Sequence, residues 1–169
     1  AQYGTDIYTR GLNVYTTIRA SDQQAAYFAL RRGIMDYERR QIYRGPEKFI
    51  TLPANPAEIE DAIDDALIEQ GDKGDLLAAV VLEATPKKVR AVRRNGETID
   101  ITGEGLQPVQ SGLSDKAQPN IKLRPGALIR ITKTPKNTWE ITQLPEVEGA
   151  FVAIDPRDGG IRALVGGFD

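Results

Sequence analysis

The chain has 169 residues, of which 40% are hydrophobic, and its formal net charge is −2. These values predict a folded protein of one large or two small domains, and they exclude binding of a polyanion through bulk positive charge. The sequence has no cysteine and no histidine, which excludes disulfides, a zinc site and a histidine-based catalytic triad, and it indicates no cofactor. No run of about 18 apolar residues is present, so we expect neither a membrane span nor a signal peptide.

The N-terminal quarter predicts a strand followed by a helix. Residues 1–11 are polar and are expected to be irregular, whereas residues 12–18 alternate between two faces and are rich in β-branched side chains, which is typical of a strand. Ser21 stands three residues before Gln24, a spacing that predicts a capping box at the start of a helix over residues 21–40.

A second, acidic helix is predicted before residue 75. Asn55 can cap it, Glu58 can complete the reciprocal cap, and Gly71 can end it. One face is an apolar stripe, and the other is either a solvated face or an acidic surface that docks a partner, because dense charge of one sign repels itself. The acidic face consists of Glu60, Asp61, Asp64, Asp65 and Glu69.

The pattern changes to a period of two from Leu76 onward. Asn95-Gly96 predicts a tight hairpin turn, and the polar stretch 103–125, rich in glycine, proline and serine, predicts a mobile loop. Five short strands with one long connection are typical of a small OB-type barrel. The predicted strands are 77–82, 89–93, 98–102, 127–133 and 138–144.

Basic side chains cluster on the first hairpin of this predicted barrel. They favour a solvated edge strand, contact with an acidic partner, or contact with the acidic helix of the same chain. Binding of single-stranded nucleic acid would need stacking aromatic residues, and residues 76–146 contain Trp139 but no tyrosine or phenylalanine. The candidate docking residues are therefore the acidic Asp61, Asp64, Asp65 and Glu69 and the basic Lys87, Lys88, Arg90, Arg93 and Arg94.

The C-terminal residues predict an antiparallel hairpin, with strands 149–154 and 161–166. Asp155 and Asp158 in its turn are expected to bond nearby backbone N–H groups, in preference to serving as a cation site or an acid catalyst. Both strands are apolar on both faces, so they need a neighbouring strand and a helical cover, which only residues 12–40 offer.

The predicted fold is therefore α+β, with a five-stranded OB-like barrel inserted into a small α/β layer made from both ends of the chain. The expected parts are the strand and helix of 1–50, an acidic helical connector at 51–75, the barrel at 76–146, and the hairpin at 147–169.

Both ends of the chain resemble a known family. The segment Gly-Leu-Asn-Val-Tyr-Thr-Thr-Ile at 11–18, a Gln-Gln-Ala-Ala helix, Tyr-Arg-Gly-Pro at 43–46 and the closing hairpin are similar to class A penicillin-binding proteins, in particular the 1A subgroup of Gram-negative bacteria. The resemblance implies a region between the glycosyltransferase and transpeptidase domains of a bifunctional peptidoglycan synthase. It also implies an OB-like domain at 76–146, with the hairpin as the first transpeptidase strands.

The chain is not expected to be an enzyme itself. A penicillin-binding transpeptidase needs Ser-x-x-Lys, Ser-x-Asn and Lys-Thr-Gly, yet none of the serines Ser21, Ser111 and Ser114 is followed by the required lysine. The run Lys133-Thr134-Pro135 has proline in place of glycine and is predicted to enter a hairpin turn.

The resemblance therefore implies a periplasmic linker and docking region of an inner-membrane-anchored protein, with no membrane contact by this segment. Its expected partners are an outer-membrane lipoprotein activator and the catalytic domains of the same parent chain. The alternatives are a rigid spacer without a partner, or a nucleic-acid or glycan binder of the OB type.

Overall fold

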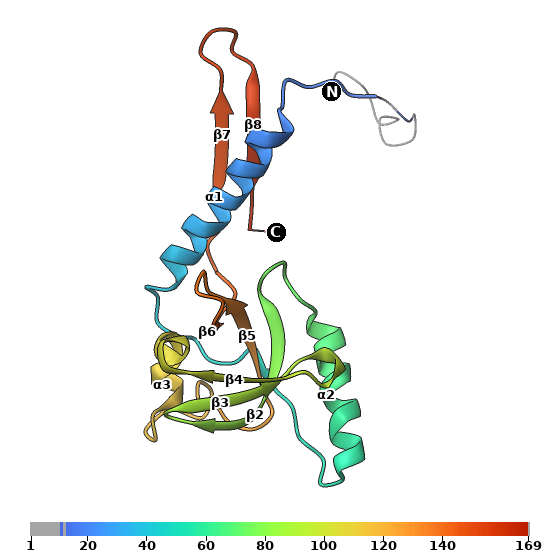
Figure 1. The fold of residues 1–169 in the computed structure, drawn as a ribbon, viewed down its shortest axis with the longest axis vertical. Helices are drawn as coiled ribbons and strands as arrows, with labels where there is room; N and C mark the ends of the chain where they lie inside the picture. Colours follow the sequence, from blue (N-terminus) through green and yellow to red (C-terminus); the bar gives the residue numbers. More distant parts are fainter. Residues whose placement is uncertain (1–10, 12, 169) are drawn as a thin grey trace. The chain divides into compact units, whose positions relative to one another are not determined.

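The computed structural model describes residue 11 and residues 13–168, which divide into two compact units (Figure 1). The first, here called the hairpin unit, combines the chain up to Gly33 with Glu148–Phe168. The second, the sheet unit, comprises Ile34–Val147 and so contains residues 34–75 together with 76–146. Helix α1 (Ala20–Glu38) runs from one unit into the other. The expected irregular segment at residues 1–11 lies outside the described residues, apart from Gly11.

The hairpin unit contains the predicted C-terminal hairpin. Strands β7 (Ala150–Ile154) and β8 (Ile161–Gly166) pair antiparallel, with Val152 opposite Leu164. The predicted strand at 12–18 is wrong, because residues 13–18 form no strand; residue 12 lies outside the described part. This segment makes isolated hydrogen bonds to the hairpin instead of a ladder. Thr17 Oγ1 donates to the Ile161 carbonyl (2.7 Å), the Arg19 N–H donates to the Arg162 carbonyl (3.0 Å), and Arg162 Nη1 donates to the Thr17 carbonyl (3.4 Å).

A side chain of α1 takes the place that a third strand would have had. The Gln23 amide donates to the Leu164 carbonyl and accepts from the Leu164 N–H, both at 2.8 Å, so it pairs with the edge of β8 as a strand would. Val14 and Tyr15, which would lie on opposite faces of a strand, are 76% and 94% exposed, so neither face of this segment is buried there. The predicted capping box is also wrong, because Ser21 is already the second residue of the helix and its hydroxyl contacts Asp22.

The sheet unit is built on one antiparallel sheet of six strands, in the order β1-β5-β2-β3-β4, with β6 also pairing with β5. All five predicted strands are present, and the sequence pattern missed the two-residue β1. Hydrogen-bonded ladders between the described residues do not close this sheet into a barrel; η3 (Gly103–Val109) packs against β4 and β6. The strands are β1 (Lys48–Phe49), β2 (Leu77–Thr85), β3 (Lys88–Val92), β4 (Thr98–Thr102), β5 (Ala127–Lys133) and β6 (Trp139–Thr142).

Both faces of the central strands are buried. On β2, Ala79 and Val81 belong to the main core, whereas Ala78 and Val80 belong to a second cluster on the opposite face. This explains why β2 is a continuous apolar run instead of an alternating one. The second cluster is completed by α2 (Pro56–Gln70), which is the predicted acidic helix and lies beside β2 in Figure 1.

The stretch 103–125, predicted to be a mobile loop, covers the main core instead. It contains η3 and the short helix α3 (Gln110–Leu113), and Leu123 N–H donates to the Gly112 carbonyl at 2.8 Å. The prediction was wrong because the apolar residues of this stretch stand singly between glycines and prolines and show no periodicity. In the structure, each of them fills one position over the sheet. The buried ones are Leu106, Val109, Leu113 and Leu123.

The hairpin turns follow the sequence prediction. Asn95 (φ 72°) and Gly96 (φ 70°) adopt the left-handed conformation between β3 and β4, as an Asn-Gly turn requires. Lys133 ends β5 and Thr134 opens the next turn, where its hydroxyl bonds the Thr138 hydroxyl at 2.7 Å. The Lys133-Thr134-Pro135 run therefore enters a turn, as predicted.

Close packing of η3 on β6 makes Gly105 sensitive to substitution. A Cβ added there would collide with the Trp139 carbonyl oxygen and would lie 3.0 Å from Cγ2 of Ile101. We expect Gly105→Ala to lower the free energy of unfolding of the sheet unit by about 1–3 kcal/mol, measured by chemical denaturation. Gly33→Ala is the control, because its added Cβ meets nothing within 4 Å and alanine favours the helix by up to about 1 kcal/mol. Equal stabilities of Gly105→Ala and wild type would contradict this account of the packing.

Candidate docking surface

Helix α2 is capped at both ends much as the sequence predicts. Asn55 Oδ1 accepts the Ala57 N–H (3.2 Å), and its amide nitrogen donates to Glu58 Oε1 (3.1 Å), so Glu58 meets the cap side chain instead of the backbone N–H. Gly71 ends the helix at φ 51°, and its N–H donates to the Leu67 carbonyl at 3.0 Å. The caps and the buried side chains of Ile63 and Leu67 determine which face of α2 points outward.

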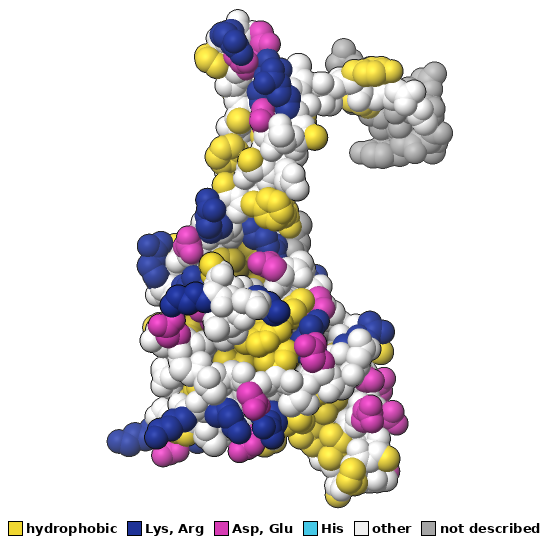
Figure 2. Space-filling model, viewed as in Figure 1, with side chains coloured by type: hydrophobic (Ala, Val, Ile, Leu, Met, Phe, Trp, Pro, Cys, Tyr) yellow, Lys and Arg dark blue, Asp and Glu magenta, His cyan; other side chains and the backbone are white. Residues whose placement is uncertain are grey.

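The outward face carries the acidic residues. Asp61 and Asp65 are exposed and stand one helical turn apart, and Ile68, which is 57% exposed, continues the same row. We call this row of three residues the acidic stripe, after its two carboxylates. Asp64 lies beside the stripe and is half-buried. Carboxylates gather along the outer edge of α2 in Figure 2, at the lower right. Among the described residues, no hydrogen bond or ion pair is present for the side chains of Asp61, Asp64 and Asp65.

Glu69, the remaining acidic candidate, is paired within the chain. Its carboxylate accepts a hydrogen bond from Nζ of Lys48 on β1. The pair is exposed, so it contributes little stability, but it removes Glu69 from the set of free charges.

The basic candidates do not form one patch. Arg90 makes two bonds to Asp100 on β4, at 2.7 and 3.0 Å, and these bonds lower the pKa of Asp100. Arg93 bonds Glu97 (3.1 Å) and Asp72 (3.4 Å), which follows α2. Asp72 lies beyond the end of α2, so this contact is not one with the acidic helix itself. Of the remaining basic candidates, Lys87 lies in the turn before β3, Lys88 begins β3, and Arg94 lies beyond its end.

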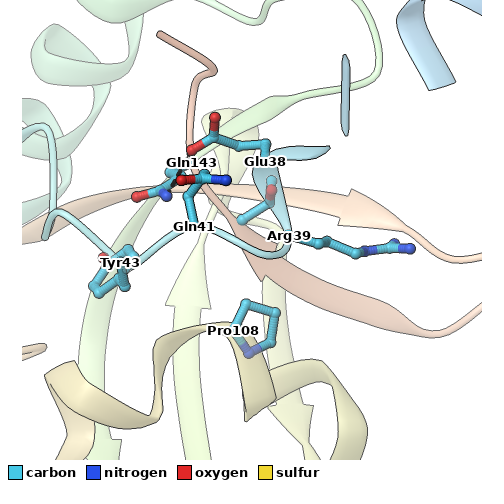
Figure 3. A pocket seen from close by; sticks show the side chains of 7 residues that line it. Glu38, Arg39, Gln41, Tyr43, Pro108 and Gln143 are labelled. Atoms are coloured by element: carbon cyan, nitrogen blue, oxygen red, sulfur yellow. Dashed lines mark hydrogen bonds between the residues drawn. The ribbon is translucent and has the colours of Figure 1, made fainter. Parts of the chain in front are cut away.

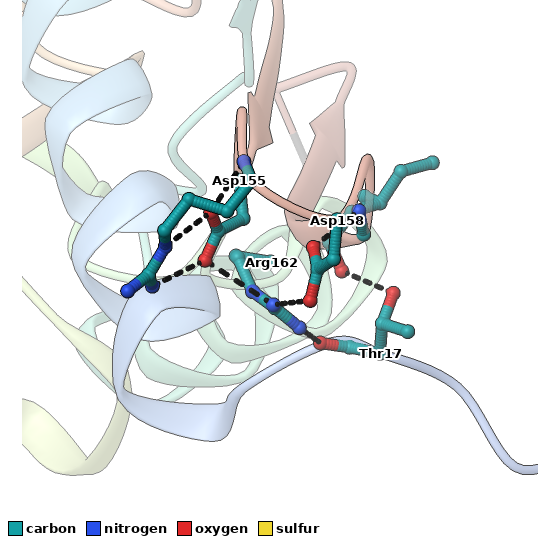
Figure 4. A network of polar contacts seen from close by, with 7 residues as sticks. Thr17, Asp155, Asp158 and Arg162 are labelled. Carbon is teal, nitrogen blue, oxygen red and sulfur yellow. Dashed lines mark hydrogen bonds and ion pairs between the residues drawn. The ribbon is translucent and has the colours of Figure 1, made fainter.

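The aspartates of the C-terminal turn serve the turn, as predicted (Figure 4). Asp155 accepts the Arg157 N–H (3.0 Å) and Asp158 accepts the Gly160 N–H (2.8 Å). Arg162 lies between the two carboxylates, 3.2 Å from Asp155 and in an ion pair with Asp158. Because guanidinium groups already neutralise both carboxylates, this arrangement disfavours a cation site.

Two hollows in the sheet unit are small compared with ligand pockets, which usually enclose about 300–1,000 Å³. The first, shown in Figure 3, has a volume of about 10 Å³. In its wall the buried carboxylate of Glu38 accepts bonds from Arg44 and Gln143, both at 2.7 Å, and Tyr43 is buried, which raises the pKa of its hydroxyl. The second, about 230 Å³, is lined by already paired charges of Arg39, Glu140, Lys136 and Glu104.

Other site types receive no support from the described residues. They contain no group of three or more acidic, histidine or cysteine residues placed to hold a metal ion. Within the same residues, no helix combines the length and the apolar character needed to cross a membrane.

Comparison with known families decides the relationship that the sequence suggested. Residues 43–147 match the model of the penicillin-binding protein OB-like domain, which is more than half of the chain. The chain belongs to this penicillin-binding protein family. The OB-like domain begins at residue 43, so that it includes β1, α2 and the whole six-stranded sheet.

Relatives extend the similarity over nearly the whole chain. Penicillin-binding protein 1A of Neisseria lactamica is 34% identical over 169 residues, which are 99% of this chain and 21% of that protein. Penicillin-binding protein 1A of Escherichia coli K12 is 35% identical over 174 residues, covering 99% of this chain and 20% of that protein. The resemblance to class A penicillin-binding proteins is thus confirmed, and the chain spans about a fifth of the length of these relatives.

A solved structure supports the fold. The 2.6 Å crystal structure of penicillin-binding protein 1A from Haemophilus influenzae matches 92% of this chain and 22% of its own, with a TM-score of 0.72 and 23% identity.

The turn network of the hairpin unit generates a prediction of pH dependence. Hydrogen bonds from the side chain and the backbone of Arg157, assisted by Arg162, hold the pKa of Asp155 well below its usual range near 3.9. A carboxyl whose pKa is lower in the folded state stabilises that state above about pH 4, and this stabilisation is lost as the pH falls through the folded pKa. We expect Arg157→Gln to raise the pKa of Asp155, observed as a higher midpoint in a carboxyl-carbon NMR titration.

The matched control is Arg90→Gln, which removes the analogous donor to Asp100. It should raise the pKa of Asp100 and leave the midpoint of Asp155 where it is in the wild type. An Asp155 midpoint that is unchanged in Arg157→Gln would refute this account of the turn.

Proposed function

We propose that the OB-like domain is a non-catalytic docking region of a periplasmic, membrane-anchored peptidoglycan synthase of the penicillin-binding protein 1A type. The parent protein would polymerise glycan strands and cross-link their stem peptides, and this domain would receive a protein partner that regulates it. The relatives named above support the parent type, and the OB-like domain match supports the position within it.

The observation that carries the docking proposal is the acidic stripe of α2, whose two carboxylates have no ion pair or hydrogen bond among the described residues. Asp61 and Asp65 are like charges at i,i+4, which destabilises a helix, and α2 has no basic residue in its last turn. In contrast, Arg90 and Arg93, two of the five basic candidates, are already neutralised within the chain. A partner with basic side chains would relieve the repulsion, and exposed Ile68 would add an apolar contact at the end of the stripe.

The proposed partner is an outer-membrane lipoprotein activator, as the family resemblance implies. The geometry adds that its docking face should be basic. Binding of single-stranded nucleic acid is less well supported, because Trp139 is half-buried against the main core and Lys133 lies over its ring at 5.1 Å. A rigid spacer without any partner is the alternative that the following experiment tests.

Reversing two charges of the stripe should weaken docking without unfolding the domain. We expect Asp61→Lys with Asp65→Lys to reduce affinity for the cognate lipoprotein by roughly tenfold, mainly through slower association that is sensitive to salt. The control, Glu83→Lys with Asp115→Lys, makes the same change in net charge at exposed positions outside α2. Titration calorimetry and stopped-flow kinetics at two salt concentrations measure both quantities.

Each outcome separates the candidates. Equal weakening by the stripe variant and the control would indicate attraction by net charge and sink the proposal of a specific acidic surface. Unchanged affinity in the stripe variant would move the docking site elsewhere on the domain. Absence of binding by the wild type would favour the spacer.

The non-catalytic part of the proposal has its own test. Acylation by penicillin requires an activated serine, and Ser21, Ser111 and Ser114 all lack a lysine three residues later. We expect a fluorescent penicillin to leave this chain unlabelled on a denaturing gel, with an active penicillin-binding protein as the positive control. Stoichiometric labelling of one serine would refute the assignment.

A further inference from the structure

A charged side chain occupies the layer between the sheet and α2. Arg130 lies on β5 and is only 1% exposed. In the ladder it stands opposite Ala78, and Leu128 stands opposite Val80, so Arg130 points to the same face as the apolar cluster that receives α2. A buried cation in such a layer is costly unless it is fully paired.

Arg130 is paired with a carboxylate and with the end of α2. Its Nε and Nη2 donate to the two carboxylate oxygens of Glu47. Nη2 also donates to the carbonyl of Gln70 at 3.1 Å, and Nη1 donates to the carbonyls of Gly71 and, at 3.4 Å, Leu76. Gln70 is the last residue of α2, so Arg130 satisfies carbonyl groups that have no donor within the helix.

These bonds determine the position of α2 along its own axis, which apolar packing does not. Ile63, Ala66 and Leu67 bury one face of α2, but apolar contact is non-directional and constrains the position of a helix along its own axis only weakly. Hydrogen bonds from a fixed guanidinium to the final carbonyls do set that position. The positive charge also lies at the negative end of the helix dipole, in a helix whose last turn has no basic residue of its own.

Lysine could not make the same set of contacts. The planar guanidinium places two donors on Glu47 and others on separate carbonyls, whereas an ammonium is a compact point charge on a flexible stem.

We propose that Arg130 is a positioning residue for the acidic stripe: from inside the domain it fixes the C-terminal end of α2 and hence the place at which Asp61 and Asp65 are presented. The consequence for docking rests on the function proposed above, whereas the effect on α2 does not depend on any partner.

Hydrogen–deuterium exchange of the whole chain tests the effect on α2. The reporter is the Gly71 amide, which donates to the Leu67 carbonyl in the last turn, and the references are amides of the β3–β4 ladder. In Arg130→Met we expect Gly71 to exchange at least about tenfold faster, because bonds from a charged donor to the helix end are lost, while the ladder amides change much less. Arg90→Met is the matched control, since it removes an exposed arginine from β3 and should leave Gly71 unchanged. Arg130→Lys, which keeps the charge, should give an intermediate rate and carries the same test if Arg130→Met does not fold.

Two results of the exchange experiment would overturn the proposal. An unchanged Gly71 rate would mean that the bonds do not hold the helix end. Equal acceleration of Gly71 and the ladder amides would mean that Arg130 only stabilises the domain as a whole.

Binding of the lipoprotein activator then tests the link to docking. A loosened helix end together with weaker binding in Arg130→Met supports the link, whereas a loosened helix end with unchanged affinity refutes it and leaves docking intact. If the wild type does not bind, the proposed function fails, and the Gly71 exchange still decides the role of Arg130 within the domain.

Discussion

Burial of β2 and β5 on both faces is the constraint on which the rest of the sheet unit depends. Strands without a solvent-facing side need two separate covers, one for each apolar face. The stretch of η3 and α3 covers one face with single buried leucines and a valine, and α2 covers the other with a regular apolar stripe. The two covers differ in sequence character because one is a long irregular connection and the other is a helix of four turns.

The same constraint explains the unusual charge distribution around α2. A helix that packs on a sheet must turn its polar side outward, and here that side is almost entirely acidic. Its final carbonyl groups lie near the sheet, where water has limited access, so the domain supplies donors from Arg130 on β5. Glu47 in turn neutralises the arginine, which makes the buried charge tolerable.

Pairing within the chain also separates charges that are available to a partner from charges that are not. The sequence offers both the basic hairpin and the acidic helix as candidate docking surfaces. Cross-strand pairing of Arg90 with Asp100, and the contacts of Arg93 with Glu97 and Asp72, neutralise two of the five basic candidates. Within the described part of the chain, the carboxylates of the acidic stripe have no such partner, because neighbouring positions on the exposed side of α2 carry the same sign of charge.

Local chemistry was sufficient to predict many elements from sequence. Asn55 and Gly71 mark the ends of α2, Asn95-Gly96 marks a turn, and the Asp-containing turn after β7 is formed by short-range bonds to backbone N–H groups. The resemblance at the two ends of the chain also indicated the correct family. For the caps and the turns, the interactions that determine the structure lie within a few residues of one another.

Only the tertiary structure decided the remaining features, because they depend on residues far apart in sequence. Residues 13–18 have the alternation of a strand, yet the Gln23 side chain pairs with the neighbouring edge of β8 at Leu164. The stretch 103–125 has the composition of a mobile loop, yet the apolar face of the sheet orders it. Arg130 appears in sequence as one polar residue in an apolar strand, and its role depends on Glu47 and on the end of α2, which reach it only when the sheet has formed. Sequence by itself determined the caps of α2, the turns, the terminal hairpin, five strands of the sheet and the family, whereas long-range burial and pairing decided which charges remain free for a partner.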